Sequence, residues 1–550
     1  MEGNGYLSLV EKTLKNNKEF VAFSDFQGES ITYAQVGERI VGIHQLYKEL
    51  GIAKGDKVAV IGRNMTSWAV VYLGTISYGA VIVPILPDFN SSDIHHIVNH
   101  SESKLLFSTD LLYDKLDETK MAKIKGIVSI NQCTTLYDNT DGVLKKAVEK
   151  AQALFKGDGK SFSDDQLSFP EIPADDLLVL SYTSGTSGFS KGVLIPHRSI
   201  WSNITYSSEH LILKPQERVV SFLPLAHVFG CLFEFLWPFV MGCHTTFLTR
   251  TPSPQVITQA FREVKPHIIL SVPLILEKIF KKRVQPQLED TKVKAMLMIP
   301  GLNKVVYSKI KKKLIEVFGG EFREMIIGGA ALNKDVEVFL RKIGFPFTIG
   351  YGMTECGPLI SYAPWTESRP YSAGKLVDRM EVKIDSDDPY NKVGEIMVKG
   401  ENTLLGYYKN QEATDEIFDE DGWLHTGDLG VIDDDNFIYI KGRSKNMLLG
   451  ASGQNIYPEE IEATITSMEY VQECLVRDHD GKLEALVYPD YEATDGEGLN
   501  QQQIEAKLDD IKKEVNKILP AFMNIQMITL FPEEFEKTPK KSIKRYKYVK

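Results

Sequence analysis

The sequence has little cysteine, and the cysteines it has are scattered. Cys133, Cys231, Cys243, Cys356 and Cys474 are odd in number and form no C-x-x-C pair. A disulfide framework would need an even set, and a structural zinc site would need closely spaced ligands. The spacing therefore disfavours both and suits a reducing compartment such as the cytoplasm.

An excess of basic residues is also missing, as is a long apolar run. The 63 Lys and Arg residues are outnumbered by 74 Asp and Glu residues, and the net charge of −11 disfavours a general nucleic-acid-binding protein. The most apolar stretch, residues 229–241, is interrupted by Glu234 and Pro238 and is shorter than the ~20 residues that span a bilayer. We expect it to be a buried helix beside a ligand pocket, and any membrane contact to be peripheral, at the inner membrane surface. The first residues have no basic segment followed by an apolar run, so we expect no signal peptide.

One stretch, residues 182–192, combines glycines, Ser and Thr residues and Lys191 between the apolar runs 177–180 and 193–195. Glycine lets backbone N–H groups approach an anion, while hydroxyls and the lysine add donors and charge. The composition predicts a loop that binds a polyphosphate. It is not a Walker A loop, because Gly192 rather than Ser or Thr follows the lysine. An ordinary Ser/Gly turn is the alternative interpretation.

Strands and helices alternate in the first part of the chain. The runs 57–62, 80–85 and 104–108 are typical of buried strands, and residues 67–79 and 92–100 of helices. This alternation predicts an α/β fold with a parallel, doubly wound sheet. Residues 137–170 are polar, and we expect them to loop over the surface.

The pattern changes near residue 381 to short strands with turns, which predicts a small antiparallel barrel or sheet. We expect an N-terminal domain over residues 1–441, with this β-rich subdomain at about 370–441, and a mobile α+β domain over 442–550.

Two further predicted strands, within residues 324–331 and 347–355, also run into glycines. Ligands of doubly wound sheets bind at the carboxyl ends of strands, so these glycines and the glycine-rich loop are expected to meet at one ligand. Basic residues at 281–283 and 304–313 flank another segment. Two solvated helix faces are the simpler interpretation of them, and a membrane patch is the alternative.

Seven blocks then occur in an order that resembles the acyl-adenylate-forming enzymes, the superfamily of acyl-CoA synthetases, luciferases and peptide-synthetase adenylation domains. The blocks are Tyr182–Gly192, Pro224–Gly230, Gly328–Leu332, Gly350–Pro358, Trp423–Gly430, Gly442–Glu462 and the tail around Thr538–Arg545. The S-G-x-N-x-x-P spacing of Ser452–Pro458 is similar to that of AMP-forming long-chain fatty acid–CoA ligases.

The resemblance implies a set of residues that bind ATP. They are Thr183, Ser184, Gly185, Thr186, Ser187, Gly188, Lys191, Gly329, Ala330, Tyr351, Gly352, Asp428 and Arg443. Tyr351 would stack on adenine, and Asp428 would accept the ribose hydroxyls. Ser187 and Ser190 depart from the family pattern, in which Thr and Pro are common, and the loss of proline removes a rigid φ.

It also implies catalytic roles for Thr354 at the α-phosphate, for Glu355 as ligand of Mg²⁺ together with Thr186, and for His227 near the acyl carboxylate. A buried, hydrogen-bonded histidine is the alternative for His227. Lys445 would be the hinge between the domains, near residues 443–445.

The family's catalytic lysine falls on Ser542 when residues are counted without gaps from Thr538. Lys540, Lys541 and Lys544 surround this position. If the loop is extended, residues two apart share a face, which favours Lys540 or Lys544. If the loop kinks after its proline, Lys541 is the catalytic residue, and we place it first.

The implied function is that of a long-chain fatty acid–CoA ligase. ATP would activate a fatty acid to an acyl-adenylate with Mg²⁺, and CoA would then accept the acyl group as AMP leaves. Two alternatives stay open: transfer to a carrier protein, and a non-catalytic fatty-acid-binding protein. We expect no nucleic-acid partner, and the oligomeric state is open.

Overall fold

Two apolar strands, β8 (Leu177–Thr183) and β9 (Lys191–Pro196), flank the glycine-rich loop, which confirms their prediction. They pair antiparallel, with Thr183 opposite Lys191. The structure is a computed structural model that describes residues 5–157, 163–183, 191–211, 213–449, 454–538 and 542–549. Residues 184–190 of the loop therefore lie outside the described part.

These strands belong to an eight-stranded sheet of order β20-β9-β8-β4-β3-β5-β6-β7. Its other strands are β3 (Lys57–Ile61), β4 (Val81–Ile85), β5 (Leu105–Ser108), β6 (Gly126–Ser129), β7 (Thr135–Asp138) and β20 (Gly406–Tyr407). The central pairs β3–β4, β3–β5, β4–β8 and β5–β6 are parallel. The α/β fold class predicted from the sequence is thereby confirmed.

Both faces of this sheet are buried. Along β3, Val58 and Val60 pack into one apolar core, whereas Ala59 and Ile61 pack into another. A strand buried on both faces needs a continuous apolar run, which is the pattern at residues 57–62. The helices of this part are α1 (Tyr6–Asn16), α2 (Tyr33–Glu49), α3 (Thr66–Tyr78), α4 (Ser91–Ser101), α5 (Asp110–Tyr113), α6 (Val143–Phe155) and α7 (His197–His210).

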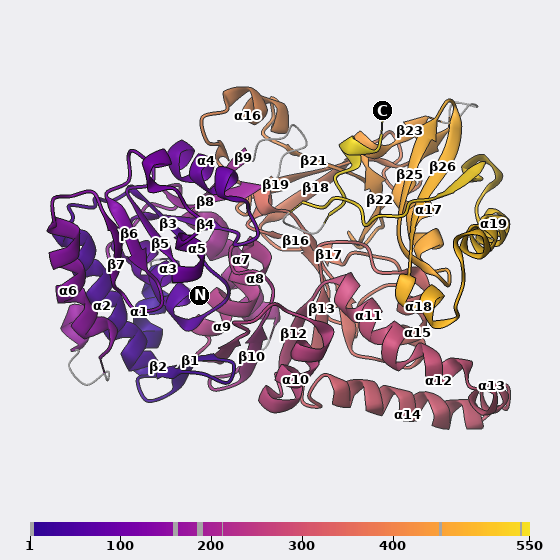
Figure 1. Ribbon diagram of the computed structural model, residues 1–550, viewed down its shortest axis with the longest axis horizontal. Helices are drawn as coiled ribbons and strands as arrows, with labels where there is room; N and C mark the ends of the chain where they lie inside the picture. Colours follow the sequence, from indigo (N-terminus) through magenta and orange to yellow (C-terminus); the bar gives the residue numbers. More distant parts are fainter. Residues whose placement is uncertain are drawn as a thin grey trace.

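The expectation of a loop over residues 137–170 is wrong, because the helix α6 lies within it and packs on α2 (Figure 1). Its buried side chains, Leu144, Ala147, Val148, Ala151 and Phe155, recur at helical spacing. The many Lys and Glu residues between them lower the mean hydropathy and hide this apolar stripe.

Two smaller sheets complete the apolar centre of the large domain. One has the order β10-β11-β1-β2 and the other β12-β13-β14. Their strands are β1 (Val21–Asp25), β2 (Ser30–Thr32), β10 (Arg218–Ser221), β11 (His244–Phe247), β12 (Ile268–Ser271), β13 (Glu324–Ile327) and β14 (Phe347–Ile349). The run 229–241 forms α8 (Val228–Cys231), a π-helical turn (Leu232–Leu236) and α9 (Trp237–Val240), and it is largely buried as predicted.

A β-rich region follows, as predicted from the short strands. It contains the sheets β15-β16-β17 and β18-β19-β21-β22, in which neighbouring strands are antiparallel. The elements are β15 (Tyr351–Gly352), β16 (Leu359–Tyr362), β17 (Lys375–Leu376), β18 (Met380–Asp385), β19 (Gly394–Gly400), α16 (Gln411–Ile417), β21 (Leu424–Ile432) and β22 (Ile438–Arg443).

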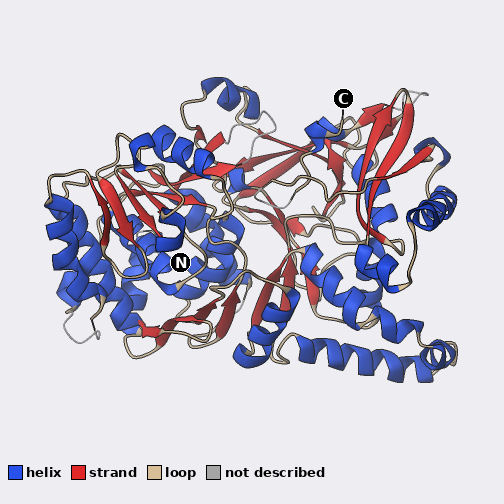
Figure 2. Ribbon diagram, in the orientation of Figure 1, coloured by secondary structure: helices blue, strands red, loops and turns tan. Residues whose placement is uncertain are grey.

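The C-terminal part forms a small α+β unit around its own apolar core, which includes Ile461, Val476 and Leu508 (Figures 1 and 2). Its main sheet has the order β25-β26-β27. The elements are β23 (Leu448–Leu449), β24 (Asn455–Ile456), α17 (Pro458–Thr466), β25 (Val471–His479), β26 (Lys482–Pro489), α18 (Tyr491–Gly496), α19 (Gln501–Ile518) and β27 (Met527–Leu530).

Between β12 and β13 the chain leaves the body as a helical arm, which forms the lower right edge in Figure 1. Its helices are α11 (Pro273–Arg283), α12 (Gln285–Glu289), α13 (Thr291–Leu297) and α14 (Leu302–Val317). The helices α10 (Pro254–Val264) and α15 (Lys334–Lys342) flank the arm in sequence. Among the described residues, no helix is both long and apolar enough to cross a bilayer.

Candidate active site

The turn that follows β15 carries two of the predicted catalytic residues, Thr354 and Glu355. The amide of Asn203, a fully buried residue of α7, donates to the Cys356 carbonyl (3.3 Å) and accepts from the Leu359 N–H (3.0 Å). The Leu404 N–H donates to the Glu355 carbonyl at 2.8 Å. A turn held by buried backbone hydrogen bonds keeps its side chains in one place. Asn203 did not emerge from the sequence, because its partners lie about 150 residues away.

The Glu355 carboxylate contacts the loop lysine through an aromatic residue, Tyr407. The Tyr407 hydroxyl donates to Glu355 Oε1 at 2.9 Å, and Lys191 Nζ lies 5.0 Å from the centre of its ring. Burial raises the pKa of Tyr407 well above its ordinary value, so the hydroxyl keeps its proton. The hydroxyl therefore acts as the hydrogen-bond donor, and the Glu355 carboxylate accepts. Such a carboxylate suits Mg²⁺, which takes one or two carboxylates together with phosphate oxygens.

Tyr407 was missed at the sequence level. It lies on β20, which pairs with β9 so that Tyr407 is opposite Val193. The one local signal is the aromatic pair Tyr407 and Tyr408, which follows Gly406. Nothing in that pair indicates that it joins a strand more than 200 residues earlier.

A second cluster brings together three residues predicted to bind the nucleoside: Tyr351, Asp428 and Arg443. The Tyr351 hydroxyl donates to Asp428 Oδ2 at 2.7 Å, and Arg443 Nε lies 2.9 Å from Asp428 Oδ1. Burial raises the pKa of Asp428, and the Arg443 guanidinium and the Tyr351 hydroxyl partly offset that rise. Each carboxylate oxygen has more than one lone pair, so Asp428 can still accept hydroxyls of a ribose.

The end of β13 meets the start of α8. A Cβ atom added to Gly328 would lie 3.0 Å from Phe229 Cζ, and one added to Gly329 would lie 3.7 Å from Val272 Cγ1. Gly329 has a φ of 89°, a conformation that other residues rarely adopt. His227 is half-buried and lies immediately before α8. The structure therefore brings the predicted residues Gly329 and His227 onto neighbouring segments.

A buried carboxyl group holds the segment that leads to His227. Glu234, in the π-helical turn, accepts from the N–H groups of Phe222 and Leu223, both at 3.0 Å. Burial raises its pKa well above the ordinary value, which favours the neutral acid. Asn64 adds two contacts to this segment, to the Leu223 carbonyl (2.7 Å) and the Leu225 N–H (3.0 Å). The sequence marked Glu234 only as an interruption of an apolar run.

In the tail of the small domain, the segments on either side of residues 539–541 run antiparallel. The Thr538 N–H donates to the Ser542 carbonyl at 2.8 Å, and Lys537 is bridged to Ile543. Lys540 and Lys541 lie outside the described part of the chain, so the choice among the three tail lysines stays a prediction. Lys544, the third candidate, forms an ion pair with Glu536.

The predicted hinge residue, Lys445, is exposed in a short turn, Ser444–Asn446. Several predicted site residues lie outside the described part of the chain. They are Ser184, Gly185, Thr186, Ser187, Gly188 and Lys541.

Comparison with known families agrees with this geometry. A family model described as "AMP-binding enzyme" matches residues 10–408, and one described as "AMP-binding enzyme C-terminal domain" matches residues 445–550. This chain belongs to the AMP-binding, adenylate-forming enzymes. The resemblance inferred from the seven sequence blocks is thereby confirmed.

Several relatives of this adenylate-forming enzyme are acyl-CoA ligases by name. It is 30% identical to "Long chain acyl-CoA synthetase 7, peroxisomal" of Arabidopsis thaliana, over 88% of this chain and 74% of the relative. It is 27% identical to the "Long-chain-fatty-acid--CoA ligase" of Salmonella typhimurium, over 81% of this chain and 78% of the relative. The chain is accordingly an adenylate-forming acyl-CoA ligase, an enzyme that joins an acid to a thiol.

Solved structures support the fold of this ligase. An anthranilate CoA ligase in complex with anthranoyl-AMP has a TM-score of 0.78 at 20% identity, covering 99% of this chain and 96% of that one. The O-succinylbenzoate coenzyme A synthetase of Bacillus subtilis, in complex with ATP and magnesium ion, has a TM-score of 0.74 at 20% identity and covers 98% of each chain. Both agree with a large N-terminal domain followed by a small C-terminal one.

Among the residues that the structure describes, one other group of side chains has the geometry of a metal site. Glu209, His210 and Asp378 lie close together at the exposed surface. The Arg379 guanidinium already lies within ion-pair distance of Glu209 and Asp378, at 3.3 and 4.0 Å. The positive charge of Arg379 at this place disfavours a metal ion, and Glu355 remains the better candidate for a metal ligand in this ligase.

Proposed function

We propose that this ligase activates a long-chain fatty acid with ATP to an acyl-adenylate and then transfers the acyl group to CoA. The observation that carries the proposal is the pair of clusters on the same turn. Tyr351 binds Asp428 at one end of the turn, and Glu355 binds Tyr407 beside Lys191 at the other. One cluster suits a nucleoside, and the other suits a metal-bound polyphosphate.

The first half-reaction joins the fatty-acid carboxylate to the α-phosphorus of ATP and releases pyrophosphate. Lys191 and the loop 183–188 would hold the β- and γ-phosphates, and Thr354 would contact the α-phosphate. Glu355, with Thr186, would hold Mg²⁺, which neutralises phosphate charge. Asp428 and Arg443 would fix the ribose, and Lys541 would reach the adenylate oxygens from the small domain. Aligning the reacting groups and stabilising charge at phosphorus are the main contributions of such a site.

The acyl group needs an apolar wall and a polar end. The buried segment from α8 to α9 would supply the wall, and His227 at its start would orient the carboxylate. The names of the relatives and the spacing of Ser452–Pro458 support a long-chain acid. A peripheral enzyme of the cytoplasm, at the inner membrane surface, would suit such a substrate.

In the second half-reaction the thiol of CoA attacks the acyl carbonyl, and AMP leaves. We propose that the small domain, residues 442–550, changes its orientation about Lys445 between the two steps. Proline at this position would fix φ near −65°. The Lys445→Pro variant should therefore form the acyl-adenylate but fail to make the thioester. Equal survival of both steps would contradict the hinge.

The reaction class is tested by incubating the ligase with ATP, Mg²⁺, CoA and a series of fatty acids of increasing chain length. We expect acyl-CoA, AMP and pyrophosphate, with a maximum among the long-chain acids. ADP and orthophosphate would instead reject adenylation. Acyl carrier protein offered in place of CoA distinguishes the alternative acceptor, and no turnover with either acceptor would favour a non-catalytic fatty-acid-binding protein.

A further inference from the structure

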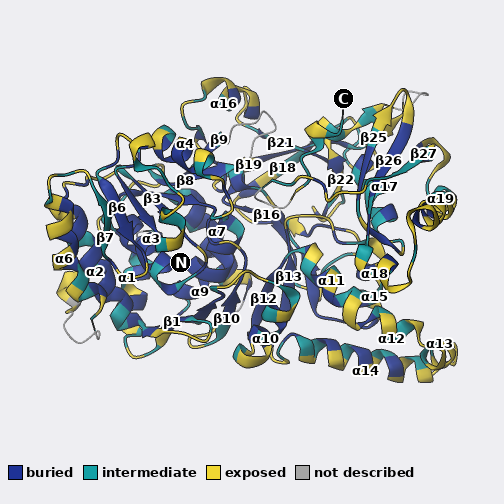
Figure 3. Cartoon of the chain, viewed as in Figure 1, coloured by how far each residue is buried: buried dark blue, intermediate teal, exposed yellow. Residues whose placement is uncertain are grey.

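The arm formed by α11, α12, α13 and α14 exposes apolar side chains at its tip. Where α14 lies against the body, Val306, Ile310 and Leu314 are buried. At the turn between α13 and α14 the pattern reverses, and Figure 3 shows mostly exposed residues there. The exposed apolar side chains are Met296 (36%), Met298 (86%), Ile299 (49%), Leu302 (42%) and Val305 (50%). An apolar group of this kind on a projecting element is typical of an interaction site.

Lysines surround this tip. Residues 278–313 contain eleven basic residues but only Glu289 and Asp290 as acids, a net charge of +9 in a chain whose total is −11. Leu302, Val305 and Lys309 follow one another at helical spacing, so they lie on one outward stripe of α14. An apolar stripe that continues into lysines is typical of helices that lie in a membrane interface.

The lysines of the arm fall into two groups. Lys281 and Lys282, at its root, form ion pairs with Asp490 (2.5 Å) and Glu492 (3.2 Å) of the small domain. The second group lies along α13 and α14, where no carboxylate of the described residues is within ion-pair distance. Its members are Lys292, Lys294, Lys304, Lys309 and Lys312. These five charges are free to contact an external anion.

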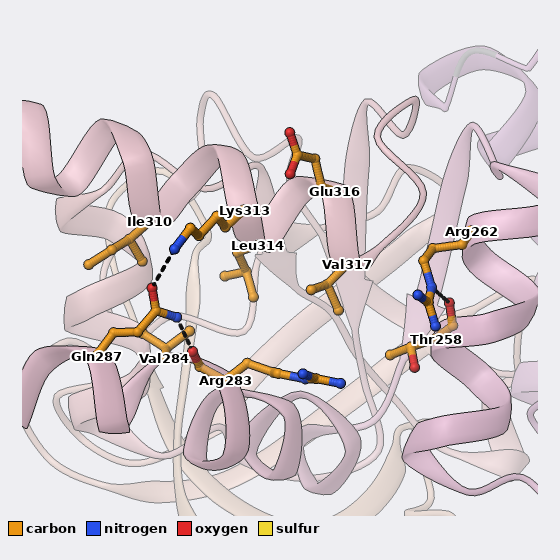
Figure 4. A pocket seen from close by; sticks show the side chains of 10 residues that line it. All are labelled: Thr258, Arg262, Arg283, Val284, Gln287, Ile310, Lys313, Leu314, Glu316 and Val317. Carbon is orange, nitrogen blue, oxygen red and sulfur yellow. Dashed lines mark hydrogen bonds between the residues drawn. The ribbon is translucent and has the colours of Figure 1, made fainter.

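Contacts at the root hold the arm together as one unit. A cleft of about 340 Å³ lies between α10, α12 and α14, with Arg262 and Arg283 in its lining (Figure 4). Across it, Gln287 accepts from Lys313, which connects α12 to α14, and Gln287 also donates to the Arg283 carbonyl one helical turn earlier. The tip is thus presented by a braced pair of helices, and the two guanidiniums extend the positive surface toward the body.

We propose that this arm docks the ligase on an anionic lipid bilayer, with the apolar tip in the interface and the five lysines at the headgroups. Charge complementarity selects this partner. The rest of the chain is acidic and is repelled by an anionic surface, so the basic arm would approach first. A second copy of the chain fits less well, because a symmetric contact would place two basic tips against each other. The proposal does not depend on which acid the ligase activates.

Flotation with lipid vesicles tests the proposal on the full chain without substrates. We expect binding to vesicles in which about a third of the lipid is phosphatidylglycerol and much weaker binding to phosphatidylcholine alone, with a loss on adding salt. Replacing Lys292, Lys294, Lys304 and Lys309 by Gln should weaken binding by about fivefold for each charge. The double variant Met298→Ser/Ile299→Ser should weaken it by about tenfold or more, because the apolar anchor is lost.

A matched control removes an exposed leucine and two lysines from the far side of the molecule, as Leu111→Ser, Lys145→Gln and Lys146→Gln. It should bind vesicles as the native chain does, and all variants should keep native circular dichroism. Native binding by the tip variant, or equal binding to both kinds of vesicle, would overturn the proposal. A dimer in lipid-free solution that the tip variant dissociates would assign the tip to a second copy instead.

Discussion

The turn that carries Glu355 and the tail around Lys541, which we propose act in the same reaction, are held in different ways. The turn is fixed by buried hydrogen bonds to its backbone, such as those of Asn203. The contacts of the tail are instead made within the small domain, where Arg545 pairs with the largely buried Glu462 and where Lys544 and Lys547 pair with the exposed Glu536. Exposed ion pairs contribute little, about 0–1 kcal/mol each. The turn therefore suits a permanent site, and the tail suits a group that arrives and leaves with its domain.

The strongest way to sharpen this comparison is to remove the charge that the tail would deliver. We expect Lys541→Ala to slow ATP-dependent acyl-adenylate formation by about 10²- to 10³-fold, the scale of one lost electrostatic contact in the transition state. A preformed acyl-adenylate should still transfer to CoA. Lys544→Ala is the control and should do far less, because this lysine already pairs with Glu536. Native adenylation in alanine variants of Lys540, Lys541 and Lys544 would move the role to Lys191 or Arg443.

In the turn, the matching variant is Glu355→Gln, which keeps the shape of the side chain and removes its charge. Acyl-adenylate formation should fall by about 10²-fold, with a higher Mg²⁺ concentration needed for half-maximal rate. A titration of the initial rate with Mg²⁺ measures both effects. An unchanged Mg²⁺ requirement would place the metal ligand elsewhere.

A smaller effect is expected where a neighbour supports the turn. Tyr407→Phe keeps the ring beside Lys191 but loses the hydrogen bond to Glu355. A hydrogen bond to a charged group contributes about 1.5 kcal/mol, so adenylation should slow by roughly tenfold. Tyr408→Phe, which loses a hydrogen bond to Glu102, is the matched control and should leave the rate near native. Equal rates for the two variants would show that Tyr407 does not position Glu355.

A contrast between local patterns and contacts of distant segments explains which features could be predicted from the sequence. Short apolar runs are local patterns, and they located β3 and β8, whereas the resemblance to a known family supplied Tyr351 and Asp428. Contacts made by distant segments leave no local pattern, which is why Asn203 and Tyr407 were missed. In the tail, the pairing of Lys537 with Ile543 likewise left no local pattern in the sequence.

The last prediction concerns stability rather than catalysis, and the buried Glu234. Burial raises its pKa above 4.5 in the folded state, so the folded chain keeps a proton that the unfolded chain releases. The stability that Glu234 contributes is then greatest below pH 4.5 and falls as pH rises toward the folded pKa, by up to about 1.4 kcal/mol per pH unit. Glu234→Gln keeps an acceptor for Phe222 and Leu223 without a titrating group.

Thermal unfolding followed from about pH 5 to about pH 8 measures this effect. The unfolding midpoint of Glu234→Gln should rise relative to that of the native chain as pH increases. Unfolding releases this proton only in the native chain, so only the native chain is destabilised by the rise in pH. A difference between the two chains that does not change with pH would mean that Glu234 is already ionised when folded.

The two-residue strand β20 has a consequence for folding while the chain is being synthesised on the ribosome. It covers the outer edge of β9, yet it lies roughly 200 residues further along the sequence. At a synthesis rate of about 5–20 residues per second, the edge of β9 stays unpaired for on the order of 10 to 40 s before β20 has been made. An uncovered strand edge is a template for pairing with another chain. Nascent chains that stall before Gly406 should therefore be the ones that aggregate or recruit chaperones.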